Sequence, residues 1–192
     1  MTREKALSLL YSHTKTESLR RHALAVEAAM RSYAARYDED QEIWGVVGLL
    51  HDFDYEQHPE FPDHPMKGSE ILASQGYPED MRRAILAHVP ATEVPRDTLM
   101  ARALFACDEL CGFIMACAMV RPTKLEGLES SSVKKKMKDK AFARGVNRDD
   151  ILKGSQELGV DLDDHIRVVV DALRKISTDL GLGNDAGENP RT

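Results

Sequence analysis

The stretch WGVVGLLHD, residues 44–52, is an apolar run that ends in an adjacent histidine and aspartate. Its apolar residues recur at helical spacing, and Asp40 just before it is of a residue type that caps helix N-termini. We therefore predict a helix that begins after Asp40 and runs directly into His51 and Asp52. The composition of this segment suits the protein interior, so its two ionisable side chains are expected close to the core, where such groups are uncommon.

Helix signals dominate on both sides of this run. No segment alternates apolar and polar residues with β-branched enrichment, so no strand is expected. Thr14 with Glu17 has the spacing of a capping box, and Asp63 is placed to cap a later helix. The expected helices lie at about 14–37, 40–50, 63–75, 78–88, 97–120, 133–143 and 161–180, with a further one beginning after Asn147. The sequence therefore predicts an all-α protein.

The chain of 192 residues is long enough for one domain with an extension. We expect a helical domain over residues 1–120, a helical extension packed on it over 121–183, and a disordered polar tail over 184–192. The longest uncharged stretch, Leu110–Val120, is too short to cross a bilayer, and residues 1–15 do not read as a signal peptide. A cytoplasmic location with no membrane partner is therefore expected.

Charge is unevenly distributed along the chain. The formal net charge of −6 argues against general nucleic-acid binding, and no specific nucleic acid partner is indicated. Residues 121–148 depart from this balance, because they hold nine Lys or Arg residues against three acids. This stretch fits an anionic partner such as a small phosphorylated substrate, while the plainer alternative is a solvated helix face.

The three cysteines, Cys107, Cys111 and Cys117, lie in one segment. Their odd number and their spacing favour neither a disulfide framework nor a zinc knuckle. We expect them to be small buried apolar residues.

Several histidines and one aspartate stand inside apolar helical sequence. His22 lies in RRHALAVEAAM, His88 ends AILAHV, and Asp108 interrupts ALFACDELCGF. A single buried histidine is more often a hydrogen-bonded core residue than a ligand, but a buried carboxylate needs a partner or a metal ion. Imidazole and carboxylate together suit Zn, Fe, Mn or Co, and helical bundles build such sites from facing helices. Several inward His and Asp residues in one small domain therefore predict a metal site.

The order of these residues resembles the HD-domain superfamily of metal-dependent phosphohydrolases, which is named for its adjacent His-Asp pair. The contexts RRHALAVE, GLLHDFD, HPMKGSEIL and LFACDEL are similar to the ligand segments of that superfamily. The run MVRPTKLEGLESSSVKKKMKDKAFARGV, residues 119–146, also resembles a bacterial subgroup of predicted HD-superfamily hydrolases. The matching ligand positions are His22, His51, Asp52, His64, His88 and Asp108.

The resemblance implies an HD-domain helical bundle, with the C-terminal helical extension packed on it. A first divalent metal ion would be held by His22, His51, Asp52 and Asp108. His64 and His88 fill the places that make related sites dinuclear, with Asp52 as the bridging carboxylate. Because His64 also stands at a loop-to-helix junction, where a polar residue is ordinary, the choice between one ion and two stays open. The ligand set does not distinguish Mn, Fe, Co, Ni, Mg or Zn. His13 and His165 match no ligand position, and we expect them at the surface.

Further residues are candidates for catalysis and for substrate binding. His58 lies in the loop that follows the His-Asp pair and, with Asp54 and Glu56, is a candidate for orienting a ligand or transferring a proton. Lys67 comes one helical turn after the third histidine of the set and is a candidate for both catalysis and phosphate binding. The other candidates for substrate binding are Arg121, Lys124, Lys134 and Lys138.

The activity implied by the resemblance is hydrolysis of a phosphomonoester or a phosphodiester, nucleotides included, by water that the metal site activates. Two other functions share the same ligand set. One is a diiron oxygenase of the same superfamily, and the other is a metal-binding ligand sensor. The basic residues favour hydrolysis, although an oxygenase with a phosphonate substrate would also use them. Neither the substrate nor the oligomeric state is indicated by the sequence.

Overall fold

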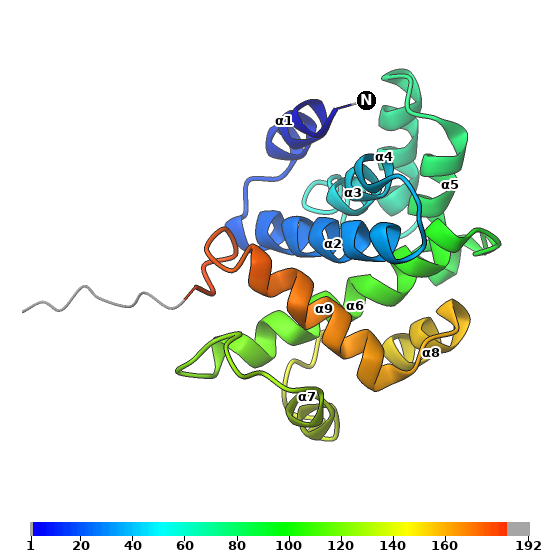
Figure 1. Ribbon diagram of the computed structural model, residues 1–192. Coiled ribbons are helices and arrows are strands. Elements are labelled where there is room, and N and C mark those ends of the chain that lie inside the picture. The colour runs from blue at the N-terminus through cyan, green and yellow to red at the C-terminus, as the bar shows by residue number, and fades with distance from the viewer. Residues whose placement is uncertain (1, 184–192) are drawn as a thin grey trace, which may run out of the picture.

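The structure, a computed structural model, describes residues 2–183 and is built of helices (Figure 1). No strand occurs in this range, so the prediction of an all-α protein is confirmed. Nor does any helix between residues 2 and 183 combine the length and apolar character that a membrane crossing requires. The predicted disordered tail, 184–192, lies outside the described residues. The helices are α1 (Arg3–His13), α2 (Glu17–Arg36), α3 (Gln41–Leu50), α4 (Asp63–Ser74), α5 (Glu79–Ala87), the short 3₁₀ helix η1 (Pro90–Thr92), α6 (Leu99–Met119), α7 (Ser130–Met137), α8 (Arg148–Leu158) and α9 (Leu162–Lys175).

Polar side chains begin three of these helices as the sequence predicts. The Asp40 carboxylate accepts hydrogen bonds from two backbone N–H groups in the first turn of α3. Asn147 and Asp161 cap α8 and α9 in the same way. Each cap satisfies N–H groups that have no partner within the helix, so these helix starts are fixed by local sequence.

Two predicted caps are wrong. Thr14 is the C-cap of α1, and its hydroxyl donates to the Phe53 carbonyl at 3.0 Å, so α2 begins only after Thr16. Asp63 lies inside the first turn of α4, where Pro62 occupies the N-cap and no side chain caps the helix. At Thr14 a tertiary contact with Phe53 replaced the predicted cap, and at α4 a proline occupies the N-cap position.

Helix α1 is not predicted by the sequence. Its charged residues, Arg3, Glu4 and Lys5, all lie in the first turn, and its buried side chains are only Ala6, Leu9 and Leu10. Two later helices differ from their predicted bounds, because α7 begins and ends earlier than expected and α9 ends at Lys175. The chain continues from there in turns to residue 182.

Helix α6 runs through the middle of the molecule, with α2 and α3 on one side and α7 and α8 on the other (Figure 1). It packs against α2, α5, α8 and α9, and its three cysteines are buried and free, as predicted. Helices α2 and α3 are in close contact, since a Cβ added to Gly48 would lie 2.9 Å from the Val26 carbonyl oxygen. This packing brings polar residues of α2, α3, α5 and α6 to one place.

The prediction that His165 lies at the surface is wrong, because His165 is fully buried on α9. Its Nε2 donates to the Ala106 carbonyl at 2.9 Å, and its Nδ1 accepts from the Tyr33 hydroxyl at 2.5 Å. The ring thereby joins α9 to α2 and α6. Burial lowers the pKa of His165 to about 4, so the ring is neutral at pH 7. His13 is half-buried and packs edge-on against Phe53.

Candidate metal centre

Six side chains from α2 to α6 and the turns next to them meet in two groups of three. Within each group the candidate ligand atoms lie within 4.8 Å of one another. Two of the six, His51 and His88, follow directly on the last residue of a helix, and Asp52 comes next after His51. The first group is His22, His51 and Asp108, and the second group is Asp52, His64 and His88.

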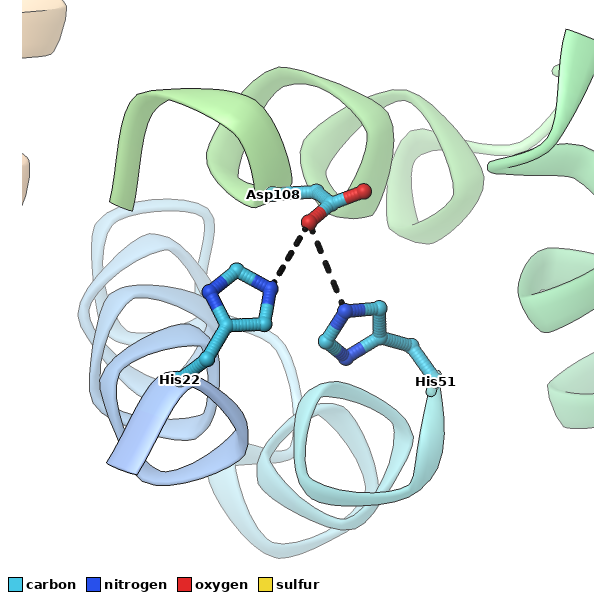
Figure 2. Close-up of side chains that lie close together, drawn as sticks. All are labelled: His22, His51 and Asp108. Carbon is cyan, nitrogen blue, oxygen red and sulfur yellow. Dashed lines mark hydrogen bonds and ion pairs between the residues drawn. The ribbon is translucent and has the colours of Figure 1, made fainter. Parts of the chain in front are cut away.

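The first group converges on one carboxylate oxygen (Figure 2). His22 Nε2 lies 3.0 Å from Asp108 Oδ1, and His51 Nε2 lies 3.4 Å from the same oxygen. Helix α2 supplies His22, the end of α3 supplies His51, and α6 supplies Asp108. Figure 2 shows both imidazoles pointing at the carboxylate from separate helices, which is the arrangement of ligands around a shared cation.

The second group is centred on Asp52. Its Oδ1 lies 3.2 Å from His64 Nε2 and 3.1 Å from His88 Nε2. Its other oxygen, Oδ2, lies 3.5 Å from His51 Nε2, which belongs to the first group. The Asp52 carboxylate therefore stands between the two groups, with one oxygen toward each.

Backbone carbonyls fix the orientation of two histidine rings. His51 Nδ1 donates to the Gly48 carbonyl at 2.8 Å, and His88 Nδ1 donates to the Ile85 carbonyl at 2.5 Å. Because a carbonyl only accepts, the Nδ1 atoms carry protons, and in the neutral ring that a metal ion requires, the Nε2 lone pair faces carboxylates. His51 Nε2 is buried and has no hydrogen-bond partner among the described residues. A cation between these lone pairs and carboxylates would satisfy both, so the donor set fits a metal ion.

The ring of His64 is oriented by a second carboxylate. His64 Nδ1 donates to Asp54 Oδ1 at 2.9 Å, and the Gly68 backbone N–H donates to Asp54 Oδ2 at 2.8 Å. Asp54 is itself buried. A carboxylate behind a ligating histidine fixes the ring and makes its other nitrogen a better ligand.

The two other loop candidates lie differently. Glu56 accepts hydrogen bonds from the Lys15 and Thr16 backbone N–H groups and from the Thr16 hydroxyl. It therefore binds the two residues just before α2 to the loop that follows α3. His58 is half-buried, and its side chain has no hydrogen-bond partner among residues 2–183. The assignment of His58 as a catalytic residue stays a prediction.

Histidines and carboxylates in this centre stabilise one another's charged forms. Burial opposes charge on Asp52 and Asp108, yet the neighbouring histidines hold the pKa of both carboxyl groups well below the usual range. Burial also opposes charge on His51 and His88, but the carboxylates raise the pKa of both rings. Against the same effect of burial, two carboxylates raise the pKa of His64 to about 9. The centre therefore attracts positive charge, whether protons or metal ions.

Two of the predicted substrate-binding residues form ion pairs with other side chains of the protein. Lys67 on α4 is exposed and pairs with Glu70 at 3.3 Å. Lys134 on α7 pairs with Asp163 of α9 at 2.7 Å. The end of α6 at Met119 lies roughly 16 Å along the helix from its metal ligand, at 1.5 Å per residue. The candidates at or beyond that end are Arg121, Lys124, Lys134 and Lys138, and their contact with substrate stays a prediction.

Two residues near the centre are missed by the sequence interpretation. Glu109 follows Asp108, is half-buried and accepts from the Asn147 backbone N–H at 3.1 Å. Burial and the Asp108 carboxylate raise the pKa of Glu109 to about 7. The Tyr55 ring packs edge-on against His64 at 5.3 Å between centroids, and Tyr55 remains 39% exposed, so it borders the open side of the second group. The available signal was adjacency to the predicted ligand Asp108 for Glu109, and adjacency to Asp54, a candidate for orienting a ligand, for Tyr55.

Comparison with known proteins agrees with this geometry. The family model of the HD domain matches residues 19–112, a range that contains all six side chains of the two groups. No curated protein and no solved structure matches the chain. The helical fold, the His-Asp pair at the end of α3 and the family match agree, and the chain belongs to the HD-domain superfamily.

Proposed function

We propose that this protein is a metal-dependent phosphohydrolase that holds two divalent ions and hydrolyses a small phosphorylated substrate. The superfamily consists of metal-dependent hydrolases in general, and the His/Asp groups are suitable ligands for such ions. The observation that carries the proposal is the position of Asp52. One of its oxygens faces His64 and His88, while the other faces His51 of the first group.

In this proposal His22, His51, Asp108 and Asp52 would hold the first ion, and Asp52, His64 and His88 would hold the second. Two divalent ions held there would lower the pKa of a water molecule to about 7 and attract the oxygens of a phosphoryl group. The chain itself supplies fixed ligand directions. His51 and His88 are held by carbonyl groups and His64 by Asp54, so their Nε2 atoms need little reorganisation to bind.

Positive charge for orienting the phosphate would come first from Lys67. It is exposed on α4, the helix that carries His64, and its 3.3 Å contact with Glu70 is a surface ion pair that is easily exchanged. The basic stretch 121–148 would act at longer range, by attracting an anionic substrate to a protein whose net charge is −6.

A panel of phosphate esters tests the proposal. Metal-stripped protein is assayed with phosphomonoesters, phosphodiesters and nucleotides after addition of Mn, Co, Mg, Ni or Zn. We expect turnover that depends on the added metal and is lost in His51→Ala and Asp52→Ala. His13→Ala is the matched control, because His13 is a half-buried histidine bonded to Gln57 outside both groups.

The same preparation separates the alternatives. Iron with an absorption band typical of an oxygen-bridged diiron centre, and no turnover of any ester, would favour the oxygenase. Tight metal binding with neither turnover nor such a band would favour a sensor. Turnover that persists in Asp52→Ala would contradict the proposed role of this site.

A further inference from the structure

Arg96, in the loop between α5 and α6, is bound on three sides. Its Nη1 donates to the Ala87 carbonyl at 2.9 Å. Its Nε and Nη2 bind the two carboxylate oxygens of Glu157 at 2.5 and 2.9 Å. Its guanidinium carbon lies 3.8 Å from the centre of the Phe105 ring. The Arg96 side chain, only 11% exposed, thus connects α5, α6 and α8.

The carbonyl that Arg96 binds belongs to the residue before His88. The last carbonyls of a helix have no partner within it, and a cation placed there also interacts favourably with the helix dipole. In α5 the Ile85 carbonyl accepts from His88 Nδ1, and the Leu86 carbonyl lies 2.9 Å from the Thr92 hydroxyl. Arg96 supplies the corresponding donor for Ala87, so the turn that presents His88 to Asp52 is held by side chains.

Glu157 is brought to Arg96 by close packing of α8 on α6. A Cβ added to Gly154 would lie 2.6 Å from the Ala106 Cα, so the two backbones are in direct contact there. Glu157 comes three residues after Gly154 and therefore lies on the same face of α8. Both residues are therefore held against α6, the helix that carries Asp108: Arg96 by its contact with Phe105, and Glu157 by the packing of α8.

We infer that the Arg96–Glu157 pair is a positioning device for His88, and that it sets the affinity of the second group for its ion. Glu157 lies outside residues 19–112, so part of the support for the metal centre comes from beyond the matched domain. A bidentate and largely buried arginine–carboxylate pair holds a fixed geometry, which an exposed pair does not. The claim about metal affinity rests on the proposed function, whereas the claim about the α5 turn does not.

The test compares Arg96→Met and Glu157→Gln with Arg83→Met. Arg96→Met keeps an apolar side chain against Phe105 but removes the N–H groups that bind Ala87 and Glu157. Glu157→Gln removes the negative charge that pairs with Arg96, and it serves as the test variant if Arg96→Met does not fold. Arg83→Met is the matched control, because Arg83 lies on α5 and forms an exposed ion pair with Asp97 at 3.2 Å.

Two measurements are made on each variant. In metal-free protein we expect amide hydrogen exchange over residues 85–92 to become at least about tenfold faster in the Arg96 and Glu157 variants and to stay unchanged in Arg83→Met. In a Co²⁺ titration we expect the ion of the second group to lose about 10- to 100-fold in affinity, while the affinity for the ion of the first group changes less than about twofold. Arg96→Lys, which keeps a cation with fewer donors, should recover part of both effects.

Unchanged exchange and unchanged affinity in both variants would overturn the inference. So would faster exchange throughout the chain with equal loss of both ions, because that result describes general destabilisation. Faster exchange confined to residues 85–92 in a protein that binds no metal would support the positioning of the turn and overturn the proposed function.

Discussion

His51 and Asp52 are adjacent in the chain, yet their side chains belong to different metal-binding groups, with His51 Nε2 3.5 Å from Asp52 Oδ2. Helix α3 ends at Leu50, and His51 and Asp52 lie in the turn that follows, where their side chains point to neighbouring groups. One carboxylate can therefore serve two ions, which is why the adjacent pair, rather than either residue alone, is the centre of the site.

Asp52→Asn should lower kcat/KM by more than about 100-fold. Loss of a residue that merely orients a ligand costs about 10- to 100-fold, and Asp52 is placed to bind both ions directly. Steady-state turnover of the best ester from the panel is the measurement. Asp38→Asn is the control, because Asp38 is exposed in a turn with φ of 58°, a conformation that asparagine tolerates. Full activity in Asp52→Asn would contradict the shared-carboxylate arrangement.

Asp54→Asn should weaken binding of the second ion by about 10- to 100-fold and leave the first ion nearly unaffected. The asparagine removes the negative charge behind His64 and leaves only one acceptor for the two donors, His64 Nδ1 and the Gly68 N–H. Isothermal titration with Co²⁺ resolves the two binding events. An affinity loss confined to the first ion would refute this role for Asp54.

Metal binding should release protons and should weaken as the pH falls. Despite burial, the carboxylates raise the pKa of His51 and His88 above its usual value, and they raise that of His64 to about 9. In the metal-free protein, His64 is therefore protonated at pH 7, and the carboxylates favour protons on the other two rings. An ion must displace those protons, so apparent affinity should fall steadily from about pH 9 to about pH 6. Titration at pH 7 in two buffers of different ionisation enthalpy measures the protons released. A binding enthalpy independent of the buffer would count against the prediction.

The stability of the fold should depend on His165 in acid. Burial lowers its pKa from 6.5 to about 4, so the folded state resists a proton that the unfolded state accepts. The contribution is present above about pH 6.5 and is lost as the pH falls toward 4, by about 3 kcal/mol. The contribution of His165 is measured as the difference in the free energy of urea unfolding between the wild type and His165→Gln across this pH range. Parallel pH profiles for the two proteins would show that His165 does not titrate in this way.

Gly48→Ala should destabilise the protein by about 1–3 kcal/mol, because the added Cβ would lie 2.9 Å from the Val26 carbonyl and would separate α2 from α3. Gly112→Ala is the contrasting substitution. Its Cβ would meet nothing closer than 3.9 Å, and alanine favours a helix interior by roughly 0.5–1 kcal/mol. Thermal unfolding compares the two. Equal effects on Tm would mean that the close approach of α2 and α3 is not the cause.

The sequence predicted what depends on local pattern. Periodicity and caps located α3, α8 and α9, because Asp40, Asn147 and Asp161 act within their own first turns. The polar interruptions at His22 and Asp108 pointed to the metal centre, since ionisable groups in apolar helices need a partner. Nothing beyond the residues themselves was required for these predictions.

What escaped prediction depends on contacts between distant segments. His165 follows three acidic residues and looks exposed, but Ala106 and Tyr33 supply its buried hydrogen bonds. The Arg96–Glu157 pair joins positions 61 residues apart. Helix α1 buries Ala6, Leu9 and Leu10, but its apolar Tyr11 is exposed, so its sequence does not show a clear apolar face without the core on which it packs.

The number of metal ions bound per chain tests the central claim most directly. Metal-stripped protein is titrated with Mn²⁺ and the bound ions are counted after equilibrium dialysis. Two ions per chain in the wild type and one in His64→Ala are the predicted result. A wild-type chain that binds no ion, or that binds the same number after His64→Ala, would contradict the two-ion centre built around Asp52.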